Sequence, residues 1–430
     1  MHEDDFDISF ESISKIEGHA GLDIRVRNKR VEDVRLRISE NKRFYTQAIR
    51  GKPFNNIPQL VSRICGTCSI AHLTCCTHAV ENALGIERSE QTMALRKLAM
   101  YGANIRDHAM HLFFFVLPDI VGRDSVLDFS GEKEEEYLRK AFRIKGVGNR
   151  MSKLIAGRAV HAMTLQLGGF SKVPSKEEAK TIVSELRGIR DDALSFLGLF
   201  AACPPIFFER TTNFVCTRAD DFSYSGVEIV TSLGTCIPEE NYFDHLYRVV
   251  IPYSQATGFE FEGRDYMVGA LARMNLNRHA LHPDTKRDCA EWLKIFPSKN
   301  VCYNNLAQAI EVIHAIDHSI ELLEGTDFKP EPQPKIEAKE SIGTDAIEAP
   351  RGTLFYSLKI GADGKIRDGT LVIPTQQNQV CMALDIKKLV EDNLAAGRSK
   401  AEIERMVEVL IRAYDPCMSC ASHFLRVRWL

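Results

Sequence analysis

The stretches RICGTCSIAH at residues 63–72 and DPCMSCASH at residues 415–423 decide how this chain folds, because each holds two cysteines three residues apart and a nearby histidine. That spacing lets both sulfurs of a pair face one point, so two pairs can form a site of four thiolates. Such a site suits a soft metal: zinc, an iron–sulfur cluster, or nickel together with iron. Nearly the whole chain lies between the pairs, so the site must bring the two ends together.

A structural zinc site is the simplest alternative for two such pairs. Zinc ribbons keep their cysteine pairs about 15 to 20 residues apart, because the metal stabilises a small fold. A chain of 430 residues can bury a large core without that help. The wide separation therefore favours a site that performs chemistry.

The overall composition is that of an ordinary globular protein, with 44% apolar residues, 26% charged residues and a net charge of −3, so no nucleic-acid partner is expected. The most apolar stretches, 111–122 and 193–208, contain proline, and neither offers the ~20 clean apolar residues of a membrane span. The acidic start MHEDDFDISF lacks an apolar signal-peptide core, which predicts a cytoplasmic location. Twelve cysteines are too few for a disulfide scaffold in a chain of this length.

The pattern along the chain predicts a single α+β domain, 1–430, that is predominantly helical. Residues 1–50 alternate polar and apolar, which predicts an antiparallel β-meander with a turn at Asn28 and Lys29. Residues 51–208 follow helical spacing and predict a helical bundle that contains the first cysteine motif. Its long helical segments are 88–117, 134–168 and 175–200.

The second half of the chain is less regular. Residues 209–325 predict a mixed segment that ends in a helix over 303–323, and residues 326–350, rich in proline and charge, predict an exposed linker. Residues 351–423 predict a short hairpin, followed by a helix whose capping box begins at Ser399 and which leads to the second motif. Residues 424–430 remain as a short tail.

The two motifs resemble the signatures of the nickel–iron hydrogenase large, or catalytic, subunit of the cytoplasmic type: R-x-C-G-x-C-x-x-x-H and D-P-C-x-x-C-x-x-H. KIEGHAG at 15–21, EAPRGTL at 348–354 and VIPT at 372–375 resemble further segments of that family. The resemblance spans residues 15–423 and is weakest in the middle. It implies a fold with an N-terminal β-meander, a central helical bundle and a C-terminal α/β segment returning to the metal site. The implied activity is reversible heterolytic cleavage of dihydrogen.

The resemblance also implies the metal ligands. Cys65 and Cys417 match the thiolates that bind nickel alone, whereas Cys68 and Cys420 match those that bridge nickel to iron. The iron would carry carbon monoxide and cyanide ligands. Thiolates are soft donors suited to nickel, and a vacant position between the metals would distinguish a catalyst from a structural site.

Further positions match residues that act on protons in the family. Arg351 matches the arginine above the open metal position, and Asp119 and Asp415 match the carboxylates that hold it. Glu17 matches the glutamate that takes a proton from a nickel thiolate toward solvent, a role suited to a carboxylate that rotates. Each has a simpler alternative, such as a turn arginine, a helix-end aspartate or a strand glutamate on the surface.

Three residues match positions around the iron and its bridging sulfur. Pro374 and Thr375 match the segment that hydrogen-bonds a cyanide ligand. His72 would donate a hydrogen bond to a bridging sulfur and tune its charge.

The chain departs from the family at a magnesium site. The usual glutamate of that site is Thr46 here, while His423 and a carbonyl near Leu371 match its other ligands. Because magnesium prefers hard anionic oxygen ligands, its binding is in doubt. A histidine of the family is also replaced, by Tyr356.

The resemblance implies partners as well. No further group of cysteines has the spacing of a cluster site. Cys75 and Cys76 continue a helical pattern and are expected to be buried core thiols, and the others are scattered: Cys203, Cys216, Cys236, Cys289, Cys302 and Cys381. Electrons would therefore leave through an iron–sulfur small subunit, and onward to subunits linked to nicotinamide, deazaflavin or ferredoxin. In the family a maturation protease removes a C-terminal extension after the final histidine, so residues 424–430 are either such a tail or a short end that is kept.

Two other functions stay open at this point. A related quinone-module scaffold subunit of respiratory complex I shares the fold but lacks the four cysteines. A zinc-stapled interaction protein without catalysis would keep the four cysteines. Metal analysis would separate the three: nickel with iron, neither metal, or zinc alone.

Overall fold

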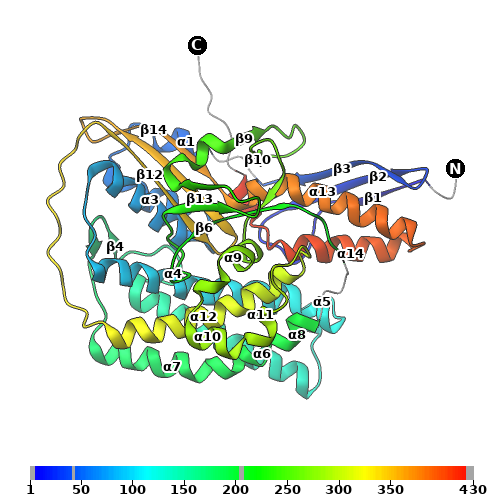
Figure 1. Cartoon of the computed structure of the whole chain (residues 1–430), viewed down its shortest axis with the longest axis horizontal. Helices are drawn as coiled ribbons and strands as arrows, with labels where there is room; N and C mark the ends of the chain where they lie inside the picture. The colour runs from blue at the N-terminus through cyan, green and yellow to red at the C-terminus, as the bar shows by residue number, and fades with distance from the viewer. Residues whose placement is uncertain (1–4, 41–43, 203–207, 423–430) are drawn as a thin grey trace, which may run out of the picture.

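The computed structural model describes residues 5–40, 44–202 and 208–422. The chain opens with an antiparallel sheet in the order β1 (Phe6–Phe10), β2 (Ala20–Arg27) and β3 (Arg30–Ile38). The turn between β2 and β3 holds Asn28 and Lys29 at φ 50° and 61°, the left-handed pair that suits a two-residue hairpin. The predicted meander is therefore confirmed, and Figure 1 shows it at one end of the molecule.

Four long helices form the body of the protein: α4 (Glu90–Met110), α6 (Glu132–Ala156), α7 (Lys176–Leu194) and α12 (Tyr303–Gly325). Both α6 and α12 pack against α4 and against α7 (Figure 1). The predicted bundle over 51–208 is thus completed by a helix from later in the chain. The expected helix over 134–168 is too long, because Gly157 ends α6 in the left-handed region at φ 77°.

The run after α4 is not a uniform α-helix. A π-helical turn, η3 (His111–Val116), follows α4 directly, and α5 (Leu117–Val121) continues from it. A π-turn inserts an extra residue per turn and so changes which side chains face inward. Side chains beyond this turn therefore point in directions that a regular helical period does not predict.

A second sheet lies across α3 (Ser69–Leu84) and has the order β12 (Ser341–Ala349), β13 (Gly352–Ile360) and β14 (Ile366–Val372). The predicted hairpin in the final segment is confirmed as β13 and β14. The predicted linker over 326–350 is wrong at its end, because residues 341–349 form β12 and are mostly buried. Gly343 permits this, since a Cβ there would lie 2.1 Å from the carbonyl oxygen of Ala79 on α3.

The last helices bring the chain back to its beginning. The sequence did not predict α13 (Pro374–Ala395), whereas α14 (Lys400–Ala413) begins at the predicted capping box of Ser399 and Glu402. The short α15 (Met418–Ala421) follows. Glu17 and Cys417 form a parallel β-bridge, so the C-terminal segment adds to the N-terminal one.

Shorter elements connect these parts. The remaining α-helices are α1 (Tyr45–Ile49), α2 (Ile57–Val61), α8 (Leu197–Ala202), α9 (Ala270–Asn277), α10 (Pro283–Asp288) and α11 (Ala290–Leu293). The remaining strands are β4 (Leu165–Gln166), β5 (Gly169–Phe170), β6 (Asn213–Arg218), β7 (Glu228–Thr231), β8 (Cys236–Pro238), β9 (Leu246–Val249), β10 (Gly258–Phe261) and β11 (Tyr266–Met267). Among the helices that the structure describes, none is both long and apolar enough to cross a membrane.

Candidate metal centre

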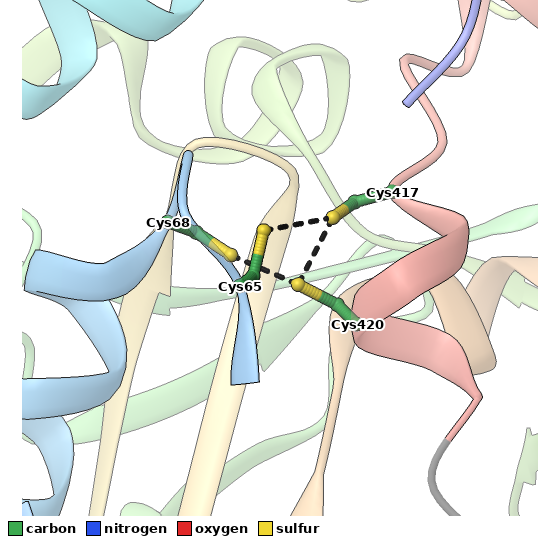
Figure 2. Close-up of side chains that lie close together, drawn as sticks. All are labelled: Cys65, Cys68, Cys417 and Cys420. Carbon is green, nitrogen blue, oxygen red and sulfur yellow. Dashed lines mark hydrogen bonds between the residues drawn. The ribbon is translucent and has the colours of Figure 1, made fainter. Parts of the chain in front are cut away.

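The four motif cysteines meet at one buried point between α3 and α15 (Figure 2). The sulfurs of Cys65 and Cys417 are 3.4 Å apart, and those of Cys68 and Cys420 are 2.9 Å apart. All four sulfurs lie within 4.8 Å of one another. The predicted convergence of the two ends of the chain is confirmed.

Local structure sets the direction of each thiol. Cys65 is extended after the 3-10 turn η2 (Ser62–Ile64), and Cys68 is the N-cap of α3. On the other side, the backbone N–H of Cys417 donates to Thr375 Oγ1 at 3.0 Å, while Met418 N–H donates to the carbonyl of Glu17 at 2.9 Å. The C-terminal pair is therefore fixed by the first turn of α13 and by the N-terminal strand segment.

The thiols differ in acidity. The hydrogen bond from Cys417 holds the pKa of Cys65 well below its ordinary value, whereas burial raises the pKa of Cys417 well above it. A bound cation would bring these thiols to the thiolate form, since thiolates are the ligands.

A small cavity adjoins three of the sulfurs, those of Cys68, Cys417 and Cys420, and Arg351 and Thr375 also line it. A structural zinc site is closed by its four ligands and needs no such space. The donor set therefore fits a soft metal, and the small cavity gives it an open side that Arg351 also lines. Sulfur donors with this adjoining space fit nickel together with iron.

Arg351 is buried and held by two carboxylates. Its Nη1 donates to Asp107 Oδ2 at 2.7 Å, and its Nη2 donates to Asp415 Oδ1 at 2.9 Å. Burial lowers the pKa of Arg351, but these two carboxylates outweigh it and raise the pKa well above the ordinary value. Arg351 is thus a fixed cation at the wall of the cavity.

The predicted pairing of Arg351 with Asp119 is wrong. Asp119 instead accepts from Lys15 Nζ at 2.6 Å and from Arg412 Nε at 2.6 Å. Asp107 takes the place beside Arg351 because it lies before the π-turn, on the face of α4 directed toward the site. The predicted contact between Arg351 and Asp415 is present.

Glu17 reaches the cluster from the N-terminal segment. Its Oε2 lies 3.0 Å from Cys417 Sγ and accepts from the backbone N–H of Ser419 at 3.1 Å. Burial raises the pKa of Glu17, although the residue keeps partial contact with solvent. A carboxyl group that touches a thiol on one side and approaches the surface on the other can exchange a proton with both.

His72 lies on the other side of the cluster. Its Nε2 is 3.8 Å from Cys420 Sγ, and its Nδ1 is 2.8 Å from the hydroxyl of Tyr356. The tyrosine hydroxyl can donate to Nδ1, which leaves the proton of His72 on Nε2, facing the sulfur. Tyr356, where the family has histidine, therefore orients His72.

Pro374 and the residues matched to a magnesium site are the other positions that the resemblance singles out. Pro374 lines the cavity, as expected for its segment. Thr46 lies in α1 and Leu371 in β14, and a threonine hydroxyl does not replace the missing carboxylate of a magnesium site. His423 and the tail 424–430 lie outside the described residues.

Sequence reasoning missed several buried polar residues around Arg351. Asp107 is one, although RDHAMH places several ionisable side chains close together at the end of α4. Gln308 on α12 is another, since its Nε2 donates to Asp415 Oδ2 at 2.9 Å. Arg273 on α9 is the third, and its Nη2 donates to the carbonyl of Pro350, directly before Arg351. A lone glutamine or arginine carries no motif that would have identified it.

Comparison with known proteins gives a consistent result. The sequence pattern of nickel-dependent hydrogenases matches residues 43–141 and 246–423. Sulfhydrogenase 1 subunit alpha of Pyrococcus furiosus is 32% identical over 98% of both chains, and sulfhydrogenase 2 subunit alpha of the same organism is 30% identical over 98% of this chain and 100% of its own. A crystal structure of an NAD+-reducing [NiFe]-hydrogenase in the H2-reduced state has the same fold, with a TM-score of 0.86 and 24% identity over 98% of this chain and 100% of that chain. The converging cysteine pairs and these matches together place the chain in the nickel-dependent hydrogenase family.

Proposed function

We propose that this chain is the catalytic subunit of a nickel–iron hydrogenase, which cleaves dihydrogen heterolytically and reversibly into protons and electrons. The main support for this proposal is the position of four buried thiols close together beside a cavity. Arg351, which forms two ion pairs, also lines that cavity. When bound, a nickel–iron centre supplies the Lewis-acidic metals at which dihydrogen is polarised.

The four cysteines hold the centre in this proposal. Cys65 and Cys417 would bind nickel alone, and Cys68 and Cys420 would bind both nickel and iron. Cys68, Cys417 and Cys420 line the cavity, so both proposed shared ligands face it. Carbon monoxide and cyanide on the iron belong to the proposal, with Pro374 and Thr375 lining the space they would occupy.

Arg351 and Glu17 have separate proposed roles. Arg351 presents a fixed positive charge to the cavity, and a buried charge acts more strongly there than in water. Glu17 accepts the proton that Cys417 Sγ carries, across the 3.0 Å contact, and passes it toward solvent. The two groups approach Cys417 from different elements, so one can be changed without moving the other.

Electrons leave through a partner in this proposal. The first cysteine motif lies close to the surface, where Gly66 is exposed. The neighbouring segment exposes 40% of Val160 and 56% of Met163, and between them His161 Nδ1 lies 3.1 Å from the carbonyl of Ser62. Large exposed apolar patches mark binding surfaces for other proteins, and these two side chains lie beside the first cysteine motif. We propose that the iron–sulfur small subunit docks here.

The nature of the further electron carriers, a cytoplasmic location and removal of the tail 424–430 by a protease remain predictions from the family resemblance. Magnesium is not required in this proposal, because Thr46 offers no anionic ligand. Removal of magnesium with a chelator is therefore expected to leave turnover unchanged.

The test is metal analysis of the purified complex together with dihydrogen-dependent reduction of an artificial electron acceptor. Nickel at one atom per chain, with dye reduction only in the nickel-loaded protein, is the expected result. Zinc in place of nickel, without dye reduction, would show a structural metal site. Neither metal would favour a scaffold subunit.

A further inference from the structure

The turn that carries Arg351 is buried, which is unusual for a hairpin connection. Ala349 pairs with Gly352 at the end of the β12–β13 ladder, so Pro350 and Arg351 alone form the turn. All four residues are buried. Connections usually run over the surface, because a buried loop would carry unpaired backbone polar groups. The carbonyl groups of this turn therefore need hydrogen-bond donors from within the protein.

Arg273 on α9 supplies these donors. Its Nη1 donates to the carbonyl oxygen of Ala349 at 3.1 Å, and its Nη2 donates to that of Pro350 at 3.0 Å. Its other N–H groups bind two buried acids: Nε and Nη2 donate to the two oxygens of Glu311, both at 2.7 Å, and Nη1 donates to Glu348 Oε2 at 2.9 Å. The guanidinium thus uses all of its donors. Lysine carries the same charge on a single nitrogen and cannot make this set of contacts.

Glu311 connects this guanidinium to the helix that also holds the side chain of Arg351. Glu311 Oε2 lies 2.8 Å from His108 Nε2, and His108 directly follows Asp107 on α4. Asp107 accepts from Arg351 Nη1 at 2.7 Å. Helix α4 is therefore linked to the guanidinium of Arg351 directly. It is linked to the backbone before Arg351 through Glu311 and Arg273.

The two strands on either side of the turn are held together by Glu348. Its Oε1 accepts from Thr353 Oγ1 at 2.7 Å and from the backbone N–H of Thr217 at 2.8 Å. Its Oε2 accepts from Arg273. Glu348, Thr353 and Arg273 are each at most 3% exposed, so these contacts are shielded from bulk water. Arg273 therefore holds the turn through its carbonyl groups and through the carboxylate that joins its strands.

We propose that Arg273 is a positioning residue for Arg351. By holding the carbonyl groups of the turn, Arg273 fixes the point from which the Arg351 side chain reaches the cavity. The lining of the cavity includes Ala349 and Arg351 but not Arg273, so Arg273 acts through the turn. A misplacement of about 1 Å at a catalytic group can lower a rate about 100-fold. The inference rests on the proposed role of Arg351 in the hydrogenase reaction.

Arg273→Lys tests this role, because lysine keeps the charge beside the two buried acids but cannot hold both carbonyl groups. A crystal structure of the purified complex with this substitution should show the Arg351 guanidinium displaced, with its contact to Asp107 or to Asp415 lost. An unmoved Arg351 with both contacts intact overturns the proposal. This readout does not depend on turnover, so it can fail while the proposed hydrogenase activity stands, and the reverse.

A double-mutant cycle separates positioning from stability. Arg273→Lys alone should lower dihydrogen-dependent dye reduction roughly 10- to 100-fold, with nickel content unchanged. In an Arg351→Lys background, the same substitution should change turnover by less than about 2-fold, because the residue through which Arg273 acts is already replaced. Equal losses in both backgrounds would show that Arg273 acts independently of Arg351, which overturns the proposal.

Arg96→Lys is the matched control. Arg96 is another buried arginine, whose Nη1 donates to Glu81 Oε2 at 2.6 Å, and it lies earlier on α4 than Asp107. This substitution also removes an arginine fork from a buried acid, so it should lower thermal stability while keeping parental turnover. A loss of turnover as large as that of Arg273→Lys would mean that general destabilisation explains both variants, against the positioning role.

Thr353→Val is the second variant, should Arg273→Lys not fold. It removes the hydroxyl that donates to Glu348 while keeping the size of the side chain. Turnover should fall with nickel content unchanged, and Thr353→Ser, which keeps the hydroxyl, should recover most of the loss. Parental turnover in a folded Thr353→Val protein would then overturn the proposal.

Discussion

Glu17 and Cys417 are joined through both backbone and side chain: the two residues form a parallel β-bridge, and Glu17 Oε2 lies 3.0 Å from Cys417 Sγ. The backbone bridge holds the carboxylate at the thiol independently of any metal. Folding of the C-terminal segment against the N-terminal one therefore creates the proposed proton contact and the four-sulfur site together.

Replacing Glu17 should separate proton transfer from metal binding. Glu17→Gln keeps the size of the side chain but cannot accept a proton near neutral pH, so turnover should fall roughly 100-fold or more with nickel retained. Glu17→Asp shortens the reach and should give an intermediate rate. The measurement is dihydrogen oxidation with an artificial acceptor, and parental rates in a nickel-loaded Glu17→Gln enzyme would mean that protons leave by another route.

The two candidate carboxylates for Arg351 can be told apart by their variants. Asp107→Asn removes one of the two charges that hold Arg351, so turnover should fall roughly 10- to 1000-fold while nickel remains bound. Asp119→Asn weakens the contacts to Lys15 and Arg412 and should lower thermal stability with a smaller loss of turnover. The reverse ranking of the two rates would favour the pairing predicted from the sequence.

Arg273 should matter for stability because it compensates two buried carboxylates. It pairs with Glu311 and Glu348, and all three side chains are at most 3% exposed. Arg273→Met would leave both acids without this partner and should lower the free energy of unfolding by about 3–5 kcal/mol. Thermal or denaturant unfolding measures this, and Arg287→Met, which removes exposed ion pairs, is the control that should leave the transition unchanged.

The proposed docking surface can be tested at Met163. This side chain is 56% exposed beside the first cysteine motif, so Met163→Glu should place a charge in the interface without disturbing the core. Co-purification with the small subunit should fall, while the variant chain keeps its fold by circular dichroism. Leu127→Glu, at a position 90% exposed, is the control; equal loss in both variants would locate the interface elsewhere.

Local signals allowed much of the fold to be predicted. The turn at Asn28 and Lys29 and the capping box at Ser399 each have a mechanism that acts within a few residues. The strand over 341–349 was missed because it follows a proline-rich stretch, and its burial depends on a close approach to α3 that only the folded chain reveals.

The four metal-ligating cysteines could be predicted from the sequence, whereas the residues that position Arg351 could not. The cysteine pairs have a spacing that allows a common metal site, and that spacing is visible in the sequence. Asp107 and Asp119 lie on the same helical run, but the π-turn between them changes the direction of their side chains. Gln308 acts through one donor and one acceptor atom, and only the positions of Asp415 and His111 give these atoms a role.

Nickel should bind to sulfur from both ends of this chain, and X-ray absorption at the nickel edge identifies its ligands. The parental complex should hold nickel with sulfur from all four cysteines as its protein ligands, and Cys420→Ser should lose both that signal and turnover, because a hydroxyl replaces a soft thiolate. Cys75→Ser, a buried cysteine that donates to two backbone carbonyls outside the centre, should keep both. Nickel bound through nitrogen or oxygen, or a Cys420→Ser enzyme with parental nickel content and turnover, would show that the two cysteine pairs do not form the nickel site.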